Sequence, residues 1–325
     1  MAITLRVTQP RLAYVPWLQK LQDFGDILEV RGRKTLEILD AVTEVKEPWH
    51  HCILIPSRRW NPWLALSEAL WILAGRNDVA ALTPYNSHIG DYSDDGISLY
   101  GAYGKRIYDQ IDNLIERLRK DPSDRRAVLQ IWDCKISEAL GITEKNDLIT
   151  NSKDPPCNNM VYFKLRQNKL HMTVMCRSND LHWGLFAVNL PTFGILQSYI
   201  AVRLGVDMGT QTHLSNSLHI YTDEPRAAAI TDRMLYTESE DIPKYPEHNL
   251  TFTDLTWIKS HEQFAEICSN VLDDKFDPNN KIVFLDFAYI FLTMYRERVN
   301  PPDVFDGMFV DWLLAGKIFA NKVWK

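Results

Sequence analysis

A cysteine that follows two prolines begins the stretch of the chain with the most chemistry. Cys157 comes directly after Pro155-Pro156, and two predicted strands follow at Met160–Leu165 and Leu170–Cys176. The second strand alternates apolar and polar side chains, which is the period of a strand with one buried face. It ends at Arg177-Ser178, where a guanidinium group and a hydroxyl group could grip a phosphate. The spacing therefore predicts a thiol nucleophile next to an anion site.

Polar and small residues continue from this strand to the next predicted helix, Thr192–Leu204. Among them are Asp180, Gly184 and Asn189, the last of which stands just ahead of the helix. The amide of Asn189 offers both a donor and an acceptor, so it could read the edge of a base. The stretch therefore combines a nucleophile, an anion site and a group that can recognise a base.

This order of nucleophile, strand pair, Arg-Ser, Asp, Gly, Asn and helix resembles the thymidylate synthase superfamily. That family includes thymidylate synthase and the deoxycytidylate and cytidylate hydroxymethylases. Other segments extend the resemblance over most of the chain. The segment Glu68-Ala69-Leu70-Trp71-Ile72-Leu73-Ala74-Gly75 is similar to the family's Glu-Leu-Leu-Trp-Phe-Leu-x-Gly, and Gly101-Ala102-Tyr103-Gly104-Lys105-Arg106 to its Val-Tyr-Gly-Lys turn. Further matches are Asp121-Pro122-Ser123-Asp124-Arg125-Arg126 to Asp-Pro-x-x-Arg-Arg and His219-Ile220-Tyr221 to His-x-Tyr.

The resemblance implies a role for each matching side chain. The catalytic residues would be Cys157, Glu68, Tyr103, Asn158 and Asp180. The nucleotide would be bound by Arg31, Arg177, Ser178, Asn179, Asn189, His219 and Tyr221, with Arg125 and Arg126 reaching the phosphate site of the partner in a homodimer. The folate would be bound by Arg58, Asp180, Trp183 and Gly184. The implied cosubstrate is 5,10-methylenetetrahydrofolate, and no metal is expected.

The implied reaction transfers a one-carbon unit to carbon 5 of a pyrimidine nucleoside monophosphate. Carbon 5 is a poor nucleophile until something adds at carbon 6, and a thiolate suits that addition when cationic neighbours lower its pKa. We expect Arg177 and the partner's Arg126 to lower the pKa of Cys157. Glu68 would manage the proton exchange, because a carboxylate among apolar residues is costly unless it has a partner or a task. A surface Glu with a partner four residues on fits poorly, because that residue is Ile72.

Several departures from thymidylate synthase bear on the product, because hydride from the folate gives a methyl group whereas water gives a hydroxymethyl group. Asn158 replaces the His that follows the cysteine, and His88-Ile89-Gly90 stands where that enzyme has a Trp. Asn189 aligns with the base-reading Asn only if one residue is inserted after Gly184. Asn179 is as in the phage hydroxymethylases.

These departures favour hydroxymethylation, with dCMP, CMP or dUMP as the nucleotide. Asn158 and Asn159 beside the nucleophile could hold a water, although Trp183 and Tyr92 could restore the apolar wall that methylation needs. A true thymidylate synthase acting on dUMP is the first alternative, and an inactive nucleotide-binding relative is the second. The retained thiol of Cys157 counts against the second, because a silent relative needs no thiol.

These residues must be positioned by an α/β fold. We expect a mixed or largely antiparallel sheet packed by helices, with strands near Thr35–Val45, Ala127–Trp132, Met160–Leu165 and Leu170–Cys176 and helices at Asn61–Gly75 and Thr192–Leu204. The resemblance adds a homodimer built by sheet-to-sheet packing. We expect a single thymidylate synthase-like domain over residues 1–325, with a core of about 13–223 and a mostly helical C-terminal extension of about 224–325.

Composition limits the other classes of protein. The chain has 325 residues, of which 46% are hydrophobic and 24% charged, as in ordinary globular proteins. A net charge of -6 argues against direct binding of nucleic acid. No apolar run is long enough to span a bilayer and the N-terminus lacks a signal-peptide core, so no membrane partner and a cytoplasmic location are expected. The five scattered cysteines have neither a disulfide framework nor metal-ligand spacing.

Overall fold

One long strand, β8 (Asp207–Tyr221), runs through the middle of the sheet on which the fold is built. In the computed structural model, which describes residues 2–134, 146–237, 252, 255–277, 282–302 and 309–324, this sheet has eight strands. Its main path is β1-β3-β8-β6-β5-β4, with β2 paired to β3 and β7 paired to β8. Because β8 is antiparallel to β3 and parallel to β6, the sheet is mixed, as predicted.

The strands predicted from the sequence are all present. They are β3 (Arg33–Val45), β4 (Val128–Gln130), β5 (Asn158–Arg166) and β6 (Lys169–Cys176), and the others are β1 (Ile3–Val7), β2 (Asp26–Val30) and β7 (Asn179–Asp180). The central β8 is an addition to the predicted sheet. Its buried positions include Gln211, His213 and Ser215, so the apolar alternation that marks a strand is absent there.

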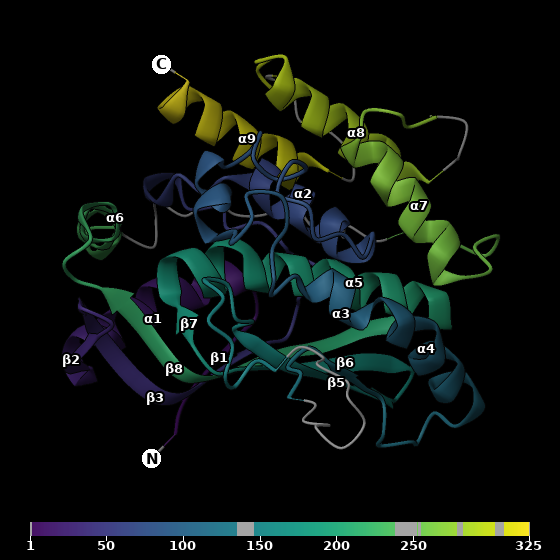
Figure 1. Cartoon of the computed structure of the whole chain (residues 1–325), viewed down its shortest axis with the longest axis horizontal. Coiled ribbons are helices and arrows are strands. Elements are labelled where there is room, and N and C mark those ends of the chain that lie inside the picture. The colour runs from purple at the N-terminus through teal and green to yellow at the C-terminus, as the bar shows by residue number, and fades with distance from the viewer. Residues whose placement is uncertain are drawn as a thin grey trace.

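Helices cover one face of the sheet in successive layers (Figure 1). α5 (Leu190–Leu204) lies on the sheet, α2 (Pro62–Leu73) packs on α5, and α8 (Val283–Arg296) and α9 (Val310–Val323) pack on α2. The rest are α1 (Tyr14–Phe24), α3 (Tyr103–Ile107), α4 (Ile111–Lys120), α6 (Pro225–Leu235), α7 (His261–Leu272), a π-helix η6 (Leu181–Asn189), and the short 3-10 turns η1 (Pro10–Ala13), η2 (Pro56–Arg58), η3 (Ser87–Tyr92) and η4 (Tyr108–Gln110). The helices after residue 224 confirm the predicted helical C-terminal region.

The apolar helices of the sequence form the core. Asn61 caps α2 by accepting a hydrogen bond from the backbone N–H of Leu64 at 3.2 Å, and Pro62 fills the first turn, where no intrahelical donor is needed. Contrary to the expectation that no apolar run is long enough to span a bilayer, the continuous stretch Leu181–Leu204 has the length and composition to do so, but 83% of its most apolar window is buried inside the fold. Its composition therefore matches its place between the sheet and α2.

The C-terminal helices hold α2 through one tryptophan. The ring of Trp63 stacks on that of Phe291 in α8, with centroids 4.8 Å apart, and on that of Trp324 after α9, at 5.3 Å. Its indole N–H donates to the carbonyl oxygen of Phe291 at 2.7 Å. Because α2 also carries Glu68, the packing of these helices fixes the position of a predicted catalytic residue.

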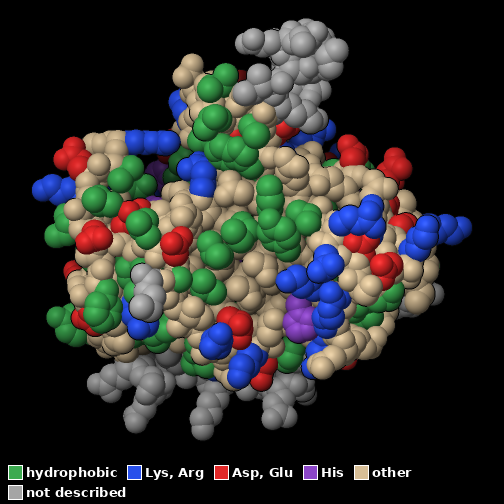
Figure 2. Space-filling view, turned by 90° about the horizontal axis from the view of Figure 1, so that it is seen from below, with side chains coloured by type: hydrophobic (Ala, Val, Ile, Leu, Met, Phe, Trp, Pro, Cys, Tyr) green, Lys and Arg blue, Asp and Glu red, His purple; other side chains and the backbone are tan. Residues whose placement is uncertain are grey.

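The opposite face of the sheet carries no helix within the part of the chain that the structure describes (Figure 1). On this face, Met160, Tyr162, Met175 and Leu214 are half-buried side chains that alternate with fully buried residues on the helix side. Figure 2 views the molecule from this side and shows hydrophobic side chains gathered near its middle. An uncovered sheet face with apolar side chains is suited to contact another protein surface.

We predict that Trp63→Ala lowers the free energy of unfolding by about 3–5 kcal/mol, the usual cost of truncating a large buried aromatic residue. Urea unfolding followed by far-UV circular dichroism would measure it. Phe24→Ala is the matched control, because that side chain is 65% exposed and its truncation should change the free energy by about 0.5 kcal/mol or less. Equal effects of the two substitutions would show that α2 does not depend on the C-terminal helices.

Candidate active site

Cys157 and Arg177 meet because they continue the two strands of one hairpin. β5 and β6 are antiparallel and Asn158 lies opposite Cys176, so the residue before β5 faces the residue after β6. The backbone N–H of Arg177 donates to the carbonyl oxygen of Cys157 at 2.9 Å, and its Nη2 lies 3.9 Å from Cys157 Sγ. The same guanidinium donates to both carbonyls of Pro155-Pro156 at 3.0 Å. The structure thus joins the predicted nucleophile to the predicted anion-binding arginine.

A cavity of about 390 Å³ lies beside Arg177 and is lined by a second arginine, Arg31. Arg31 stands in the turn between β2 and β3 with a left-handed φ of 53°. The Arg177 guanidinium lies over the ring of Trp132, 5.6 Å from its centroid. The nearby Arg33 does not line this cavity, and its Nε lies 3.2 Å from Asp223 Oδ1 in an ion pair. Two guanidinium groups at one cavity can bind a dianion such as a phosphate.

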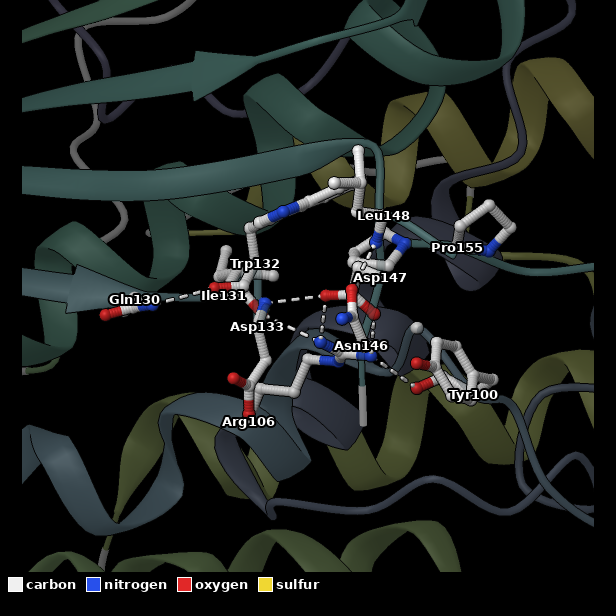
Figure 3. Close-up of polar contacts among 12 residues, drawn as sticks. Tyr100, Arg106, Gln130, Ile131, Trp132, Asp133, Asn146, Asp147, Leu148 and Pro155 are labelled. Atoms are coloured by element: carbon white, nitrogen blue, oxygen red, sulfur yellow. Dashed lines mark hydrogen bonds and ion pairs between the residues drawn. The ribbon is translucent and has the colours of Figure 1, made fainter. Parts of the chain in front are cut away.

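A buried ion pair holds the wall of this cavity (Figure 3). Arg106 of α3 donates to both carboxylate oxygens of Asp147 at 2.7 and 3.0 Å, and the backbone N–H of Asp133 donates to the same carboxylate at 2.6 Å. Burial is the largest single influence and opposes ionisation of Asp147, but the hydrogen bonds and charge of Arg106 together with the backbone N–H of Asp133 and the Tyr100 hydroxyl place its pKa below the usual range. Asp147 lines the cavity, so this pair ties the segment before the nucleophile to α3. No motif pointed to it.

Glu68 lines a second cavity, of about 640 Å³, together with Tyr92, Trp183 and Tyr221. Burial raises the pKa of Glu68 from 4.5 to about 7, and the negative charge of Asp154 acts in the same direction. A carboxyl group that titrates near neutral pH can both accept and donate a proton. Trp183 and Tyr92 give this cavity an aromatic side in place of the Trp that is absent near Ile89.

The pKa of Cys157 corrects a prediction. Burial raises the pKa of its thiol above the usual 9.0, although Arg177 and, more weakly, Arg31 act in the opposite direction. In the single chain, loss of hydration therefore outweighs the cationic neighbours that were expected to lower it. Tyr103 lies close enough for the two groups to interact, and burial raises the pKa of its hydroxyl well above 10.0. The Tyr103 hydroxyl therefore keeps its proton at physiological pH and can donate a hydrogen bond.

Three asparagines predicted to act at the site form one buried row. Asn158 Nδ2 donates to Asn189 Oδ1 at 3.1 Å, and Asn189 Nδ2 donates to Asn179 Oδ1 at 3.1 Å. Asn179 Nδ2 donates to Ser215 Oγ at 2.9 Å. A side chain at Gly184 would place its Cβ 2.6 Å from Asn179 Oδ1, so only glycine lets the backbone cover this row. The hydrogen bonds along the row therefore set the orientation of each amide group.

The π-helix accounts for the extra residue between Gly184 and Asn189. η6 ends where the backbone N–H of Leu190 donates to the carbonyl of Leu185, five residues earlier. A π-helix accommodates one residue more than an α-helix over the same length, and such insertions are frequent at functional sites. The π-helix can therefore accommodate the extra residue that the resemblance implies after Gly184, and Asn189 lies at the end of η6, in the amide row.

The predicted folate residues lie at the start of η6. Asp180 caps this helix by accepting the backbone N–H of Trp183 at 2.7 Å, and burial raises its pKa, opposed by the charge of His219. The buried Arg58 donates to the carbonyl oxygen of His182 at 2.6 Å, and its guanidinium lies 5.4 Å from the centroid of Trp183. Trp183 is 44% exposed, so its ring is available as a flat apolar surface.

The predicted sugar-binding residues lie on β8. Pairing of β7 with β8 puts Asp180 beside His219, whose ring meets that of Tyr221 edge-on with centroids 5.4 Å apart. Ser178 is half-buried between the anion-binding Arg177 and the amide row, and its carbonyl oxygen accepts the Cys176 thiol at 3.2 Å. Among these residues, Tyr221 lines the cavity of Glu68 and Arg177 lines the anion cavity.

The predicted interface arginines stand apart from the cavity in the single chain. Arg125 and Arg126 are both exposed, and neither lines the cavity shared by Arg31 and Arg177. Arg126 pairs with Asp124 of its own chain, with Nη2 and Oδ2 2.9 Å apart. The single chain therefore does not bring these two residues to the site.

The cysteines and possible metal ligands form no second centre in the described ranges. No disulfide joins the cysteines there, and Cys157 is half-buried, whereas Cys52, Cys176 and Cys268 are buried and Cys134 is exposed. No group of three or more His, Cys, Asp or Glu side chains gathers there as a metal site.

Comparison with known proteins agrees with this geometry. The model of the thymidylate synthase family matches residues 13–260. A deoxyuridylate hydroxymethyltransferase of Bacillus phage SP01 is 33% identical over 278 residues, which are 81% of this chain and 68% of that protein. One from Pseudomonas phage M6 is 35% identical over 212 residues, 62% of this chain and 58% of the relative. A putative thymidylate synthase from Methanocaldococcus jannaschii is 38% identical over 215 residues, 65% of this chain and 87% of the relative.

The match covers most of the chain, and it includes every residue of the site described above. The helices α7, α8 and α9 begin after its end, although they pack on α2 within it. The family-model match, the mixed sheet and the arrangement of cysteine, arginine and asparagines agree, and the chain belongs to the thymidylate synthase family.

Proposed function

We propose that the protein transfers a one-carbon unit from 5,10-methylenetetrahydrofolate to carbon 5 of a pyrimidine nucleoside monophosphate and releases the 5-hydroxymethyl nucleotide. The observation that carries this proposal is the thiol of Cys157, 3.9 Å from Arg177 at a cavity with a second arginine. Such a site can hold a nucleotide phosphate while a thiol reaches the base. The names of the phage relatives, deoxyuridylate hydroxymethyltransferases, support dUMP as the nucleotide.

The reaction would begin at Cys157. Its sulfur forms a bond to carbon 6 of the base, and the ring electrons then make carbon 5 nucleophilic. Because burial raises the pKa of the thiol, the thiolate has to form in the complex, where Arg177 stabilises it. Glu68 lines the adjoining cavity and is suited to move the proton that leaves carbon 5. Asn189 would hold the edge of the base through the donor and acceptor that the amide row leaves free.

The folate would lie against Trp183. Asp180 Oδ2 is buried and has no hydrogen-bond partner among the described side chains and backbone, so it can accept an N–H group of the pterin. Arg58, Arg226 and Arg233 line a cavity of about 360 Å³ next to Trp183, and their positive charge suits the carboxylates of the folate tail. When bound, the folate supplies a one-carbon unit at the oxidation level of formaldehyde.

Methylation, as in a true thymidylate synthase, is the second candidate. Trp183 and Tyr92 line the cavity of Glu68, and an aromatic wall there favours hydride transfer because it excludes water. The name of the Methanocaldococcus jannaschii relative, putative thymidylate synthase, points the same way. The two candidates share Cys157 and differ only in what reaches the methylene carbon.

The product distinguishes the two candidates. We expect dUMP and 5,10-methylenetetrahydrofolate in oxygen-18 water to give labelled 5-hydroxymethyl-dUMP and tetrahydrofolate, detected by mass spectrometry. Parallel reactions with dCMP, CMP and UMP would rank the base and the sugar. Stoichiometric dihydrofolate with dTMP would replace hydroxymethylation by methylation. No tritium release from carbon 5 of any of the four nucleotides would reduce the protein to an inactive nucleotide-binding relative.

Arg177→Ala should weaken binding of the nucleotide about 10- to 150-fold, because a hydrogen bond to a charged group contributes about 1.5–3 kcal/mol. Isothermal titration with dUMP would measure the change. Arg6→Ala is the control, since Arg6 is an exposed arginine on β1, paired only at the surface with Glu44. An Arg177→Ala protein that binds dUMP as tightly as the Arg6→Ala protein would remove Arg177 from the phosphate site.

We also propose a homodimer built on the uncovered face of the sheet. On that face Leu214 of β8 lies beside Met175 of β6, and both are half-buried. Arg125 and Arg126 are exposed, so they are available to a second chain. Two-fold packing through this face could bring these arginines to the partner's phosphate site, where added positive charge would further favour a dianion and the thiolate.

We expect light scattering at micromolar concentration to give the mass of two chains, and Leu214→Arg to give the mass of one, because a buried unpaired charge would oppose the contact. Tyr236→Arg is the control, since Tyr236 is 85% exposed after α6. A stable wild-type monomer, or a dimer that survives Leu214→Arg, would contradict this interface. A monomer would also remove the cross-subunit role of Arg125 and Arg126.

A further inference from the structure

Asn158, the residue after the proposed nucleophile, is fully buried, and only the Nδ2 group of its amide makes a hydrogen bond within the described residues. Asn158 is 0% exposed, and its Nδ2 donates to Asn189 Oδ1 at 3.1 Å. Its Oδ1 is buried and has no hydrogen-bond partner in the portion of the chain that the structure describes. An unpaired buried acceptor is unfavourable in a folded protein. This oxygen is therefore suited to a donor that arrives with the reactants.

The orientation of this oxygen is set from the far end of the amide row. Asn189 is itself held by Asn179 at 3.1 Å, and Asn179 by Ser215 at 2.9 Å. If the amide of Asn158 turned over, its oxygen would face the oxygen of Asn189, and two acceptors would meet without a proton between them. The row therefore leaves Asn158 Oδ1 free at its end.

That end of the row is next to the nucleophile in the chain and is connected through Asn189 to the segment that lines the cavity of Glu68. Cys157 directly precedes Asn158 in the chain. On the other side, Asn189 ends the π-helix segment whose preceding residues, Ala187 and Val188, line the cavity together with Glu68. Through Asn189, the amide row therefore joins the residue next to the nucleophile to the segment that lines the cavity of Glu68.

We propose that Asn158 Oδ1 binds the water that attacks the methylene group carried on carbon 5. This role rests on the hydroxymethylation proposed above. A bond forms between the water oxygen and the methylene carbon, and the π electrons of the double bond from carbon 5 to the methylene carbon move to form the second bond between carbons 5 and 6. The bond from carbon 6 to Cys157 sulfur breaks, and the thiolate leaves. The proton released by the water passes to the carboxylate of Glu68. By accepting one O–H, Asn158 leaves a lone pair of the water free for the carbon.

A competing nucleophile makes this step measurable. 2-Mercaptoethanol in the buffer can add to the same methylene carbon, forming a carbon–sulfur bond where water would form a carbon–oxygen bond. Both products arise from one intermediate, so the affinities for nucleotide and folate cancel from their ratio. The ratio of the thioether to the 5-hydroxymethyl product therefore reports the addition of water alone.

Asn158→Ala should raise that ratio about five- to tenfold at a fixed concentration of thiol, because one hydrogen bond to the attacking water is lost. Asn158→Leu removes the same acceptor without opening a cavity and should give the same rise. Asn158→Asp keeps an acceptor oxygen and should return the ratio toward the wild-type value. Asn113→Ala is the control, an exposed asparagine of α4 whose Nδ2 donates to the carbonyl oxygen of Asp109 and which takes no part in the amide row. Tritium release from carbon 5 verifies that each variant forms the intermediate.

The outcomes separate this role from the proposed function. Hydroxymethylation by the wild type with an unchanged ratio in Asn158→Ala and Asn158→Leu overturns the role of Asn158 alone. The same result with a changed preference between dUMP and dCMP would assign the amide to the base instead. Dihydrofolate and dTMP from the wild type would overturn the proposed function, and the water-binding role with it. Loss of tritium release in both variants would also contradict the proposal, since it places Asn158 before water addition.

Discussion

The pairing register of β5 with β6 is the constraint on which the site depends. Because Asn158 lies opposite Cys176, the chain can only place Cys157 against Arg177, at the open end of the hairpin. The register is set by burial of side chains such as Val161, since a slip of one residue would turn the buried face of β5 to the outside. The same slip would take Asn158 out of the amide row. Hydrophobic packing in the sheet therefore fixes the nucleophile and its neighbours.

Several ionisable groups of the site are buried, and burial disfavours their charged forms. Burial raises the pKa values of Cys157, Glu68 and Asp180, so the charged form of each is less favourable than in water. Such a site needs a rigid surrounding, and α2 obtains it from the stacking of Trp63 on Phe291. The helices α7, α8 and α9 begin after the region that matches the family model, yet they pack on α2, which carries the proposed general acid and base Glu68.

The part of the site that depends on neighbouring residues in sequence could be predicted. Cys157, the β5–β6 hairpin and Arg177 follow one another, and their alternation of apolar and polar residues can be read directly. Contacts between distant segments could not be predicted, such as the buried pair of Arg106 and Asp147, which are 41 residues apart. The same holds for the amide row, which exists only once sheet and π-helix have met. In the single chain, burial outweighs the expected lowering of the Cys157 pKa by Arg177, and this could not be predicted because a sequence shows charges but not the extent of burial.

The most direct test of the account is whether Cys157 forms a covalent bond with the nucleotide. 5-Fluoro-dUMP leaves carbon 6 open to addition but has no hydrogen on carbon 5 to lose, so its complex with 5,10-methylenetetrahydrofolate should accumulate. After proteolysis, mass spectrometry should find the nucleotide and folate masses on the peptide that contains Cys157 and not on the one that contains Cys176. A nucleotide attached to another residue, or tritium release by a Cys157→Ala protein at the wild-type rate, would contradict the account.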